Sequence, residues 1–192
     1  MFQSDLTENK PNILLDKDGI KVEKQSGVCY YTTFEITNNK LNLVDIINFD
    51  LLSLVSELNP DIFESITIDK INEEEANVVI VMKHLFKDIG MSQKYLCLNI
   101  KLTQPTSPFF KFTSRSIPCK RPDFVPINAE FVELGRIETM CKIITQNHIS
   151  INNYTYIDNI TTTFVDKITA SMTFKIIKRI IKFVTEYNQV KP

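Results

Sequence analysis

Residues 173–188, TFKIIKRIIKFVTEYN, form the most regularly patterned stretch of the sequence and decide the fold. When they are placed on a helix at about 100° per residue, the apolar side chains fill one half of the circle. These are Phe174, Ile176, Ile177, Ile180, Ile181, Phe183, Val184 and Tyr187. Four basic side chains fill a narrower arc opposite them: Lys175, Lys178, Arg179 and Lys182. The pattern predicts an amphipathic C-terminal helix with Ser171 as its N-cap.

Such a helix can cover a core, lie on a membrane surface or dock into a partner protein. Its apolar arc is wide, which is typical of a helix that packs on a core. Interfacial membrane helices often carry Trp, and this chain has none. The segment also follows a series of predicted strands, and a one-sided sheet needs something to cover its apolar face. We therefore expect the helix to pack on the sheet, with its basic arc in solvent.

The segments before this helix are mostly strands. In 28–37 and 94–103, β-branched, aromatic and aliphatic residues alternate with polar ones, which is the pattern of half-buried strands. Further strands are expected at 62–71, 78–86, 109–117, 129–134, 136–146, 148–157 and 160–169. A short strand pair is expected around Asp18-Gly19, and Asp158-Asn159 is expected to join the last two strands in a hairpin.

One further helix is expected at 43–58. Apolar residues recur there at helical spacing, Asn42 can cap its start, and Asn59-Pro60 can end it. Together these elements predict a single α+β domain over residues 13–188. It would contain six to eight mostly antiparallel strands, one helix after the first strand, and the C-terminal helix. Residues 1–12 are expected to be a flexible arm, and residues 189–192 a C-terminal tail.

Over residues 28–188, this order of elements resembles the helix-grip arrangement of the START and Bet v 1 type. In that arrangement a curved antiparallel sheet wraps a long C-terminal helix. The chain departs from many Bet v 1 members after the first helix, where NPDIFES (59–65) replaces a glycine-rich loop. The resemblance implies a module that encloses an apolar small molecule. A different α+β sheet is the alternative architecture.

Composition narrows the classes of function. The chain has 192 residues, a net charge of −1 and only four glycines, which do not cluster. A glycine-rich phosphate loop is therefore excluded, and no cofactor is expected. The N-terminus lacks a signal-peptide profile, so an intracellular protein is expected. The four cysteines show no metal-ligand spacing and are expected to be free thiols.

Few residues suggest catalysis or metal binding. His84 and His148 lie in predicted strands with no local nucleophile or orienting carboxylate. Glu73, Glu74 and Glu75 belong to a hairpin turn and lack the alternating pattern of a calcium loop. Glu133 and Glu138 flank Gly135, but the sequence does not fix their separation. The residues therefore predict neither an active site nor a metal site.

The loop 118–128, PCKRPDFVPIN, and the preceding strand offer a contact surface. Aromatic and basic residues mix there, as in proteins that bind single-stranded nucleic acid. However, Phe110 and Phe112 share one strand face, which leaves the basic residues on the other, as an ordinary half-exposed strand would. We expect instead a protein contact centred on Phe124 and flanked by basic side chains. Those are Lys111, Arg115, Lys120 and Arg121.

Two functions from different classes remain, besides an enzyme whose catalytic residues are dispersed in the sequence. The leading expectation is a non-enzymatic structural or assembly protein that contacts other protein chains. Because Ile, Asn and Lys are frequent and have AT-rich codons, a minor capsid or virion component of a large AT-rich DNA virus is its expected form. The alternative is a helix-grip module that binds an apolar small molecule. A large apolar cavity beneath the C-terminal helix favours the alternative, and a filled core favours the structural role.

Overall fold

The structure, a computed structural model, describes residues 11–25, 28–85, 87–157 and 162–187. The expected N-terminal arm up to residue 10, the expected tail and the expected Asp158-Asn159 turn lie outside these residues. The described helices are the 3₁₀ turns η1 (Leu43–Ile46) and η2 (Lys87–Ile89) and the α-helices α1 (Asp50–Leu58) and α2 (Thr163–Glu186). The strands are β1 (Asn12–Lys17), β2 (Ile20–Gln25), β3 (Cys29–Thr37), β4 (Phe63–Lys70), β5 (Glu75–Met82), β6 (Lys94–Thr106), β7 (Phe109–Ser116), β8 (Glu130–Phe131), β9 (Arg136–Thr145) and β10 (His148–Tyr156).

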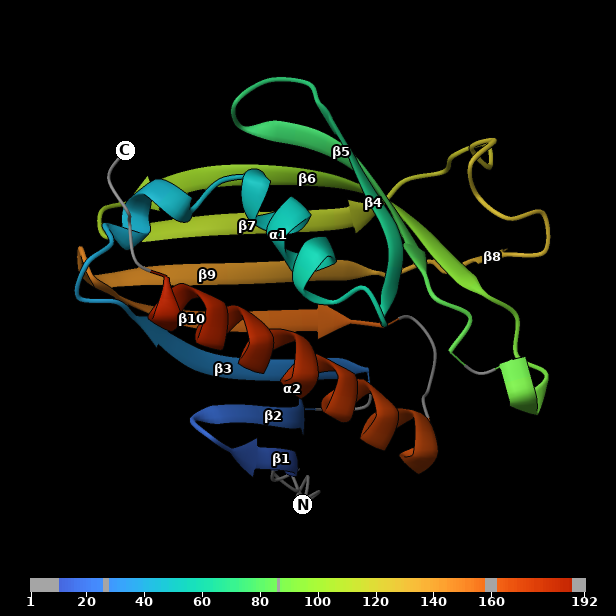
Figure 1. The fold of residues 1–192 in the computed structure, drawn as a ribbon, viewed down its shortest axis with the longest axis horizontal. Coiled ribbons are helices and arrows are strands. Elements are labelled where there is room, and N and C mark those ends of the chain that lie inside the picture. The colour runs from blue at the N-terminus through green and yellow to red at the C-terminus, as the bar shows by residue number, and fades with distance from the viewer. Residues whose placement is uncertain (1–10, 26–27, 86, 158–161, 188–192) are drawn as a thin grey trace, which may run out of the picture.

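These strands form one sheet, and the predicted single α+β domain is confirmed. The described strands number ten, more than the six to eight expected, in the order β1-β2-β3-β10-β9-β7-β6-β5-β4, with the short β8 paired to β6. The pairs along this order are antiparallel, and β8 runs parallel to β6. Figure 1 shows α1 and α2 on the same side of the sheet, which we call the helix-bearing face.

The predicted pair of strands around Asp18-Gly19 is confirmed as β1 and β2. Asp18 and Gly19 have φ angles of 53° and 75°. Two successive residues with positive φ are typical of the tight turn that matches the twist of a hairpin. Because β1 and β2 precede β3, the first helical segments follow the third strand and not the first.

The predicted helix at 43–58 is broken into η1 and α1. Asn42 caps η1 as expected, since its side chain accepts a hydrogen bond from the Val44 N–H. Phe49 lies roughly 240° from Leu43 on a continuous helix, so one straight helix cannot bury both side chains on one side. The break lets Leu43 and Phe49 both reach the core, where they are 0% and 2% exposed. Asn59 ends α1 as predicted.

The strand predicted at 160–169 is wrong, because α2 already begins at Thr163. Its N-cap is Thr162, whose side chain accepts a hydrogen bond from the Val165 N–H, so the predicted cap at Ser171 is wrong as well. The buried positions of the first turns are Asp166 and Ala170, whereas Phe164 is 59% exposed. The spacing of apolar residues in these turns therefore does not show which side chains are buried.

No described helix is long and apolar enough to cross a bilayer.

The helix-bearing face is covered in two halves. Under α2, buried side chains of the helix pack on strands β2, β3, β9 and β10. The helix side chains at the centre of this cluster are Ile177, Ile180 and Val184, at 7%, 8% and 2% exposure. Under α1, Phe49 and Leu52 pack on β5 and β6. The expectation that the C-terminal helix packs on the sheet is thus confirmed.

A buried ion pair fixes the start of α2. The Asp166 carboxylate accepts hydrogen bonds from Lys24 Nζ at 2.9 and 3.0 Å and from the Tyr30 hydroxyl at 2.5 Å. Only 15% of the Lys24 side chain and 8% of the Asp166 side chain are exposed. Asp166 also lies in the first turn of α2, where a negative charge interacts favourably with the helix dipole. The first turn is therefore held by the buried Lys24–Asp166 pair, whereas the buried side chains farther along the helix are apolar.

The opposite face of the sheet is covered in part by the loop 118–128. Val125 of the loop is 2% exposed and packs with Val81, Tyr95 and Cys97. A disulfide joins Cys97 of β6 to Cys119 of the loop, with Cα atoms 6.4 Å apart. The expectation of four free thiols is therefore wrong for this pair. The fold brings together two cysteines that are 22 residues apart, and their spacing in the sequence gave no sign of it.

Candidate functional site

A hollow of about 360 Å³ lies between the η1–α1 segment and the C-terminal end of α2. Its volume lies within the roughly 300–1,000 Å³ range of small-molecule pockets. The lining residues are Leu41, Asp45, Ile46, Asn48, Asp50, Leu51, Leu54, Phe183, Val184 and Tyr187. Seven of these ten are apolar or aromatic, so the walls suit an apolar molecule. We call this hollow the α1–α2 pocket.

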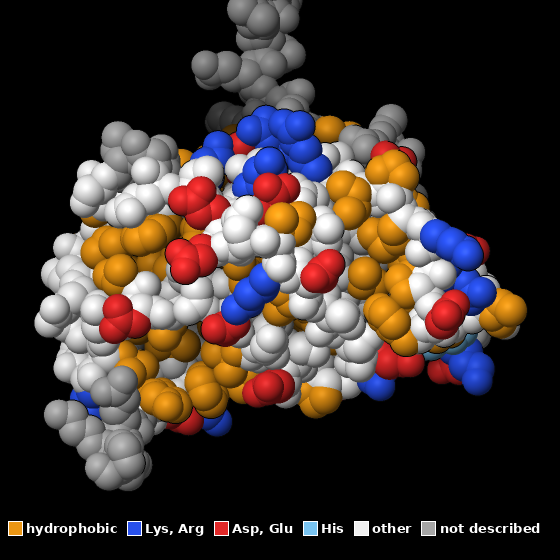
Figure 2. Space-filling model, turned by 90° about the horizontal axis from the view of Figure 1, so that it is seen from above, with side chains coloured by type: hydrophobic (Ala, Val, Ile, Leu, Met, Phe, Trp, Pro, Cys, Tyr) orange, Lys and Arg blue, Asp and Glu red, His pale blue; other side chains and the backbone are white. Residues whose placement is uncertain are grey.

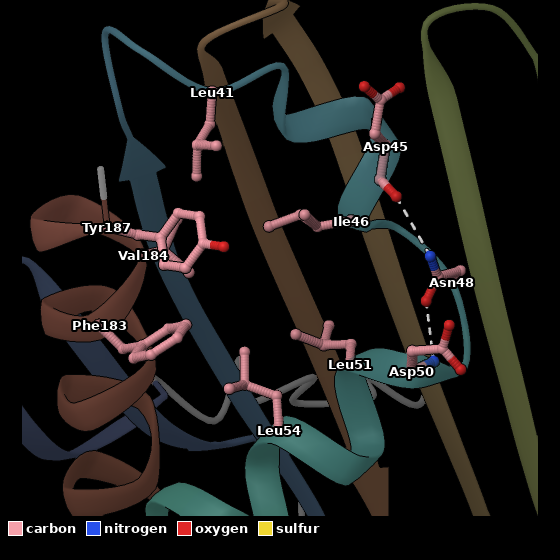
Figure 3. A pocket seen from close by; sticks show the side chains of 10 residues that line it. All are labelled: Leu41, Asp45, Ile46, Asn48, Asp50, Leu51, Leu54, Phe183, Val184 and Tyr187. Carbon is pink, nitrogen blue, oxygen red and sulfur yellow. Dashed lines mark hydrogen bonds between the residues drawn. The ribbon is translucent and has the colours of Figure 1, made fainter. Parts of the chain in front are cut away.

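The two walls come from distant parts of the sequence. Figure 3 shows Ile46, Leu51 and Leu54 pointing from the η1–α1 segment toward the side chains of α2. Phe183 and Tyr187 form the facing wall, with their ring centroids 5.5 Å apart. These two aromatic side chains are 36% and 44% exposed. They belong to the apolar arc of α2 but not to its buried stripe, so the helix presents apolar surface to the pocket as well as to the core.

Polar groups at the edge of the pocket are occupied by local hydrogen bonds. Asn48 Nδ2 donates to the Asp45 carbonyl at 3.1 Å, and Asn48 Oδ1 accepts from the Asp50 N–H at 2.8 Å (Figure 3). The Asp45 carboxylate accepts from Asn42 Nδ2 at 3.0 Å. Asp50 forms an exposed ion pair with Lys70 at 2.7 Å. These bonds fix the break between η1 and α1, which shapes one wall.

A shallower groove of about 700 Å³ adjoins the pocket and shares Phe183 with it. Its lining includes Arg179, which donates to Asn59 Oδ1 at 3.1 Å and forms an ion pair with Asp61. Lys175 also pairs with Asp61, and these two cations, Arg179 foremost, hold the pKa of the Asp61 carboxyl well below its usual range. The pairs tie α2 to the connection between α1 and β4. Ion pairs therefore cross this groove, whereas the α1–α2 pocket has mostly apolar walls.

The residues predicted to contact a partner lie away from this pocket. Phe124 is 53% exposed in the loop that packs on the opposite face of the sheet. In the same loop, Lys120 is exposed and Arg121 donates to the Val125 carbonyl at 3.2 Å. On β7, Arg115 is exposed, while Lys111 forms an ion pair with Glu138 at 2.7 Å. The structure thus places all five on or beside one face and leaves the predicted contact a prediction.

The view from above shows no broad surface of one charge. On the surface seen in Figure 2, acidic and basic side chains are intermixed, with hydrophobic patches between them. A nucleic-acid groove would instead place cations along a continuous track. This distribution gives the nucleic-acid reading no support on the face shown.

The residues considered for catalysis have structural partners. His148 Nε2 lies 2.9 Å from the Glu35 carboxylate, and His84 Nε2 lies 2.6 Å from the Met91 carbonyl oxygen. The free cysteines Cys29 and Cys141 are buried, and burial raises the pKa of the Cys141 thiol to about 12. Such a thiol is not a nucleophile at neutral pH. Among the described residues, no group of three or more His, Cys, Asp or Glu side chains could hold a metal ion.

Comparison with known proteins gives the fold but no family by sequence. No family model and no curated protein sequence matches the chain. The human StarD13 (DLC2) lipid transfer and protein localization domain is similar in structure, with a TM-score of 0.69 and 6% identity over 93% of this chain and 90% of that one. Human StAR-related lipid transfer protein 5 has a TM-score of 0.66 and 8% identity over 94% and 88% of the two chains. A STAR-related lipid transfer protein fragment from Xanthomonas axonopodis has a TM-score of 0.64 and 11% identity over 91% and 98%.

These likenesses overturn the leading expectation of a structural or assembly role. The fold is that of START-type domains, and neither a minor capsid role nor a virion location finds support among them. Codon-driven composition misled the prediction because it reports on the genome and not on the folded surface.

The pocket residues were also missed, since apolar residues of 43–58 and 173–188 were all assigned to the core. The chain has the helix-grip fold of START-type domains, as the order of its elements predicted.

Proposed function

We propose that this chain is a helix-grip module that binds an apolar small molecule of lipid type in the α1–α2 pocket. The observation that carries the proposal is the pocket itself, in which aliphatic side chains face two partly exposed aromatic rings across about 360 Å³. Leaving such surface in water is unfavourable by about 25 cal/mol per Å², so an apolar occupant gains free energy.

Proteins of similar structure also support this proposal. Three proteins with this fold carry lipid transfer in their names. Their sequence identity to this chain is at most 11%, so the shared feature is the fold, and the binding residues must be this chain's own. The proposed action is binding without catalysis, and none of the described residues that line the pocket is Ser, Thr, Cys, Lys or His.

Filling the pocket should abolish binding. Leu51→Trp places an indole between the two walls, and we expect the affinity for the neutral apolar dye Nile red to fall at least about tenfold, or about 1.4 kcal/mol. Fluorescence titration of the dye measures the affinity, and a melting curve shows that the variant is folded. A matched control is Ile71→Trp, because Ile71 is 54% exposed in the turn between β4 and β5.

The control should bind the dye as the wild type does. Equal affinity in wild type and Leu51→Trp would place the binding elsewhere and overturn the proposed site. A wild-type chain that does not bind the dye would overturn the proposed function.

A further inference from the structure

We propose that the ligand is a neutral apolar molecule with one hydroxyl or carbonyl group, and that the Tyr187 hydroxyl recognises this group. The inference rests on the proposed function and names the ligand class of the same pocket. It is carried by the position of Tyr187, by the lack of a hydrogen bond from its hydroxyl to any described residue, and by the lack of a cationic side chain among the described residues that line the pocket.

The backbone of Tyr187 is held on both sides. Tyr187 is the C-cap of α2, and its N–H donates to the Phe183 carbonyl at 2.9 Å. Its own carbonyl accepts from Asn38 Nδ2 at 3.0 Å, and the same amide donates to the Val184 carbonyl at 2.5 Å. Asn38 is 5% exposed, so the helix end is tied to the chain just after β3 by a buried side chain. The backbone that carries the Tyr187 ring is therefore held in place by hydrogen bonds.

The Tyr187 side chain is 44% exposed, and its hydroxyl points into the α1–α2 pocket. Figure 3 shows the Tyr187 hydroxyl pointing across the pocket toward Ile46 and Leu51. No hydrogen bond joins this hydroxyl to any residue in the described part of the chain. When an apolar ligand displaces water from the pocket, an unpaired hydroxyl would cost free energy. A ligand with an acceptor or hydroxyl at this point would avoid that cost.

The lining of the pocket offers no counter-ion to an anionic ligand. None of the described residues that line it is Lys, Arg or His. Asp45 and Asp50 lie at its edge, but Figure 3 shows both carboxylates turned away from Tyr187. A carboxylate that left water for this pocket would lose hydration without gaining an ion pair. Fatty acids would therefore be disfavoured relative to neutral alcohols, ketones or esters of the same length.

A pair of ligands that differ by one hydroxyl tests the inference. Displacement of Nile red by octanol and by octane is measured for wild type, for Tyr187→Phe and for Tyr154→Phe. Tyr154 is the matched control because its ring stacks on Tyr31 of β3, with centroids 4.7 Å apart, outside the pocket lining. In Tyr187→Phe we expect octanol affinity to fall about fivefold, as loss of one hydrogen bond predicts, and octane affinity to stay unchanged. Octanoate should bind wild type more weakly than octanol at neutral pH.

Each other outcome counts against the inference. An equal loss for octanol and octane would mean that the ring packs on the ligand without recognition by the hydroxyl. Unchanged octanol affinity in Tyr187→Phe would remove Tyr187 from recognition while leaving the proposed function intact. A wild-type chain that binds the dye, octanol and octane not at all would overturn the proposed function and this inference with it.

Discussion

Replacing Ile177 with aspartate should unfold the domain. Ile177 is 7% exposed and lies in the cluster that joins α2 to the sheet. A carboxylate at this point would be buried without a partner, which ranks among the most destabilising single changes, at more than about 4 kcal/mol. Because whole domains are stable by only about 5–15 kcal/mol, most or all of the stability would be lost. Circular dichroism during urea or thermal unfolding measures the effect.

The neighbouring position on the solvent side is the control for this change. Lys178 is exposed, with an ion pair to Asp18 at 2.6 Å. Lys178→Gln removes that exposed pair and should change stability by about 1 kcal/mol or less. A folded, soluble Ile177→Asp variant that has merely lost binding to liposomes would contradict core packing and would make α2 a membrane-surface helix.

Removing the Asp166 carboxylate should be nearly as damaging. Asp166→Ala leaves Lys24 largely buried without the carboxylate that both Lys24 and Tyr30 contact. Breaking a buried ion pair by removing one partner costs about 3–5 kcal/mol. We expect the first turns of α2 to detach, which hydrogen exchange of the amides in 163–172 would report.

Asp61→Ala provides the comparison for Asp166→Ala. Asp61 also pairs with cations of α2, but 43% of its side chain is exposed. Solvent screening weakens such pairs, so the loss should be about 1 kcal/mol. If the two variants lose the same stability, the buried pair is not what holds the start of the helix.

Much of the fold could be predicted from the sequence because periodicity reports burial. The alternation in 28–37 and the helical period after residue 173 each identified an element and its buried face. Prediction failed at the start of α2, where the buried positions are Asp166 and Ala170 and an exposed phenylalanine replaces the expected polar residue. Periodicity cannot recognise a helix whose buried face is held by an ion pair formed with a residue 142 positions away.

The candidate site could be predicted only as a class. The order of the elements implied an apolar ligand, but no local motif marks Leu51, Leu54 or Tyr187. The pocket exists because the chain breaks between η1 and α1, and that break is imposed by the burial of both Leu43 and Phe49. This constraint comes from contacts with segments distant in the sequence, so the local pattern of residues does not show it. The same holds for the Cys97–Cys119 bond, which depends on the loop 118–128 folding back onto β6.

Native mass spectrometry shows directly whether the chain carries an apolar alcohol in the α1–α2 pocket. The purified chain is incubated with phosphatidylcholine vesicles that contain hexadecanol, separated from them, and measured alongside Leu51→Trp. We predict that the wild type carries one hexadecanol molecule per chain and that Leu51→Trp carries none. A bare wild-type chain under these conditions, or equal loading of the two proteins, would contradict it.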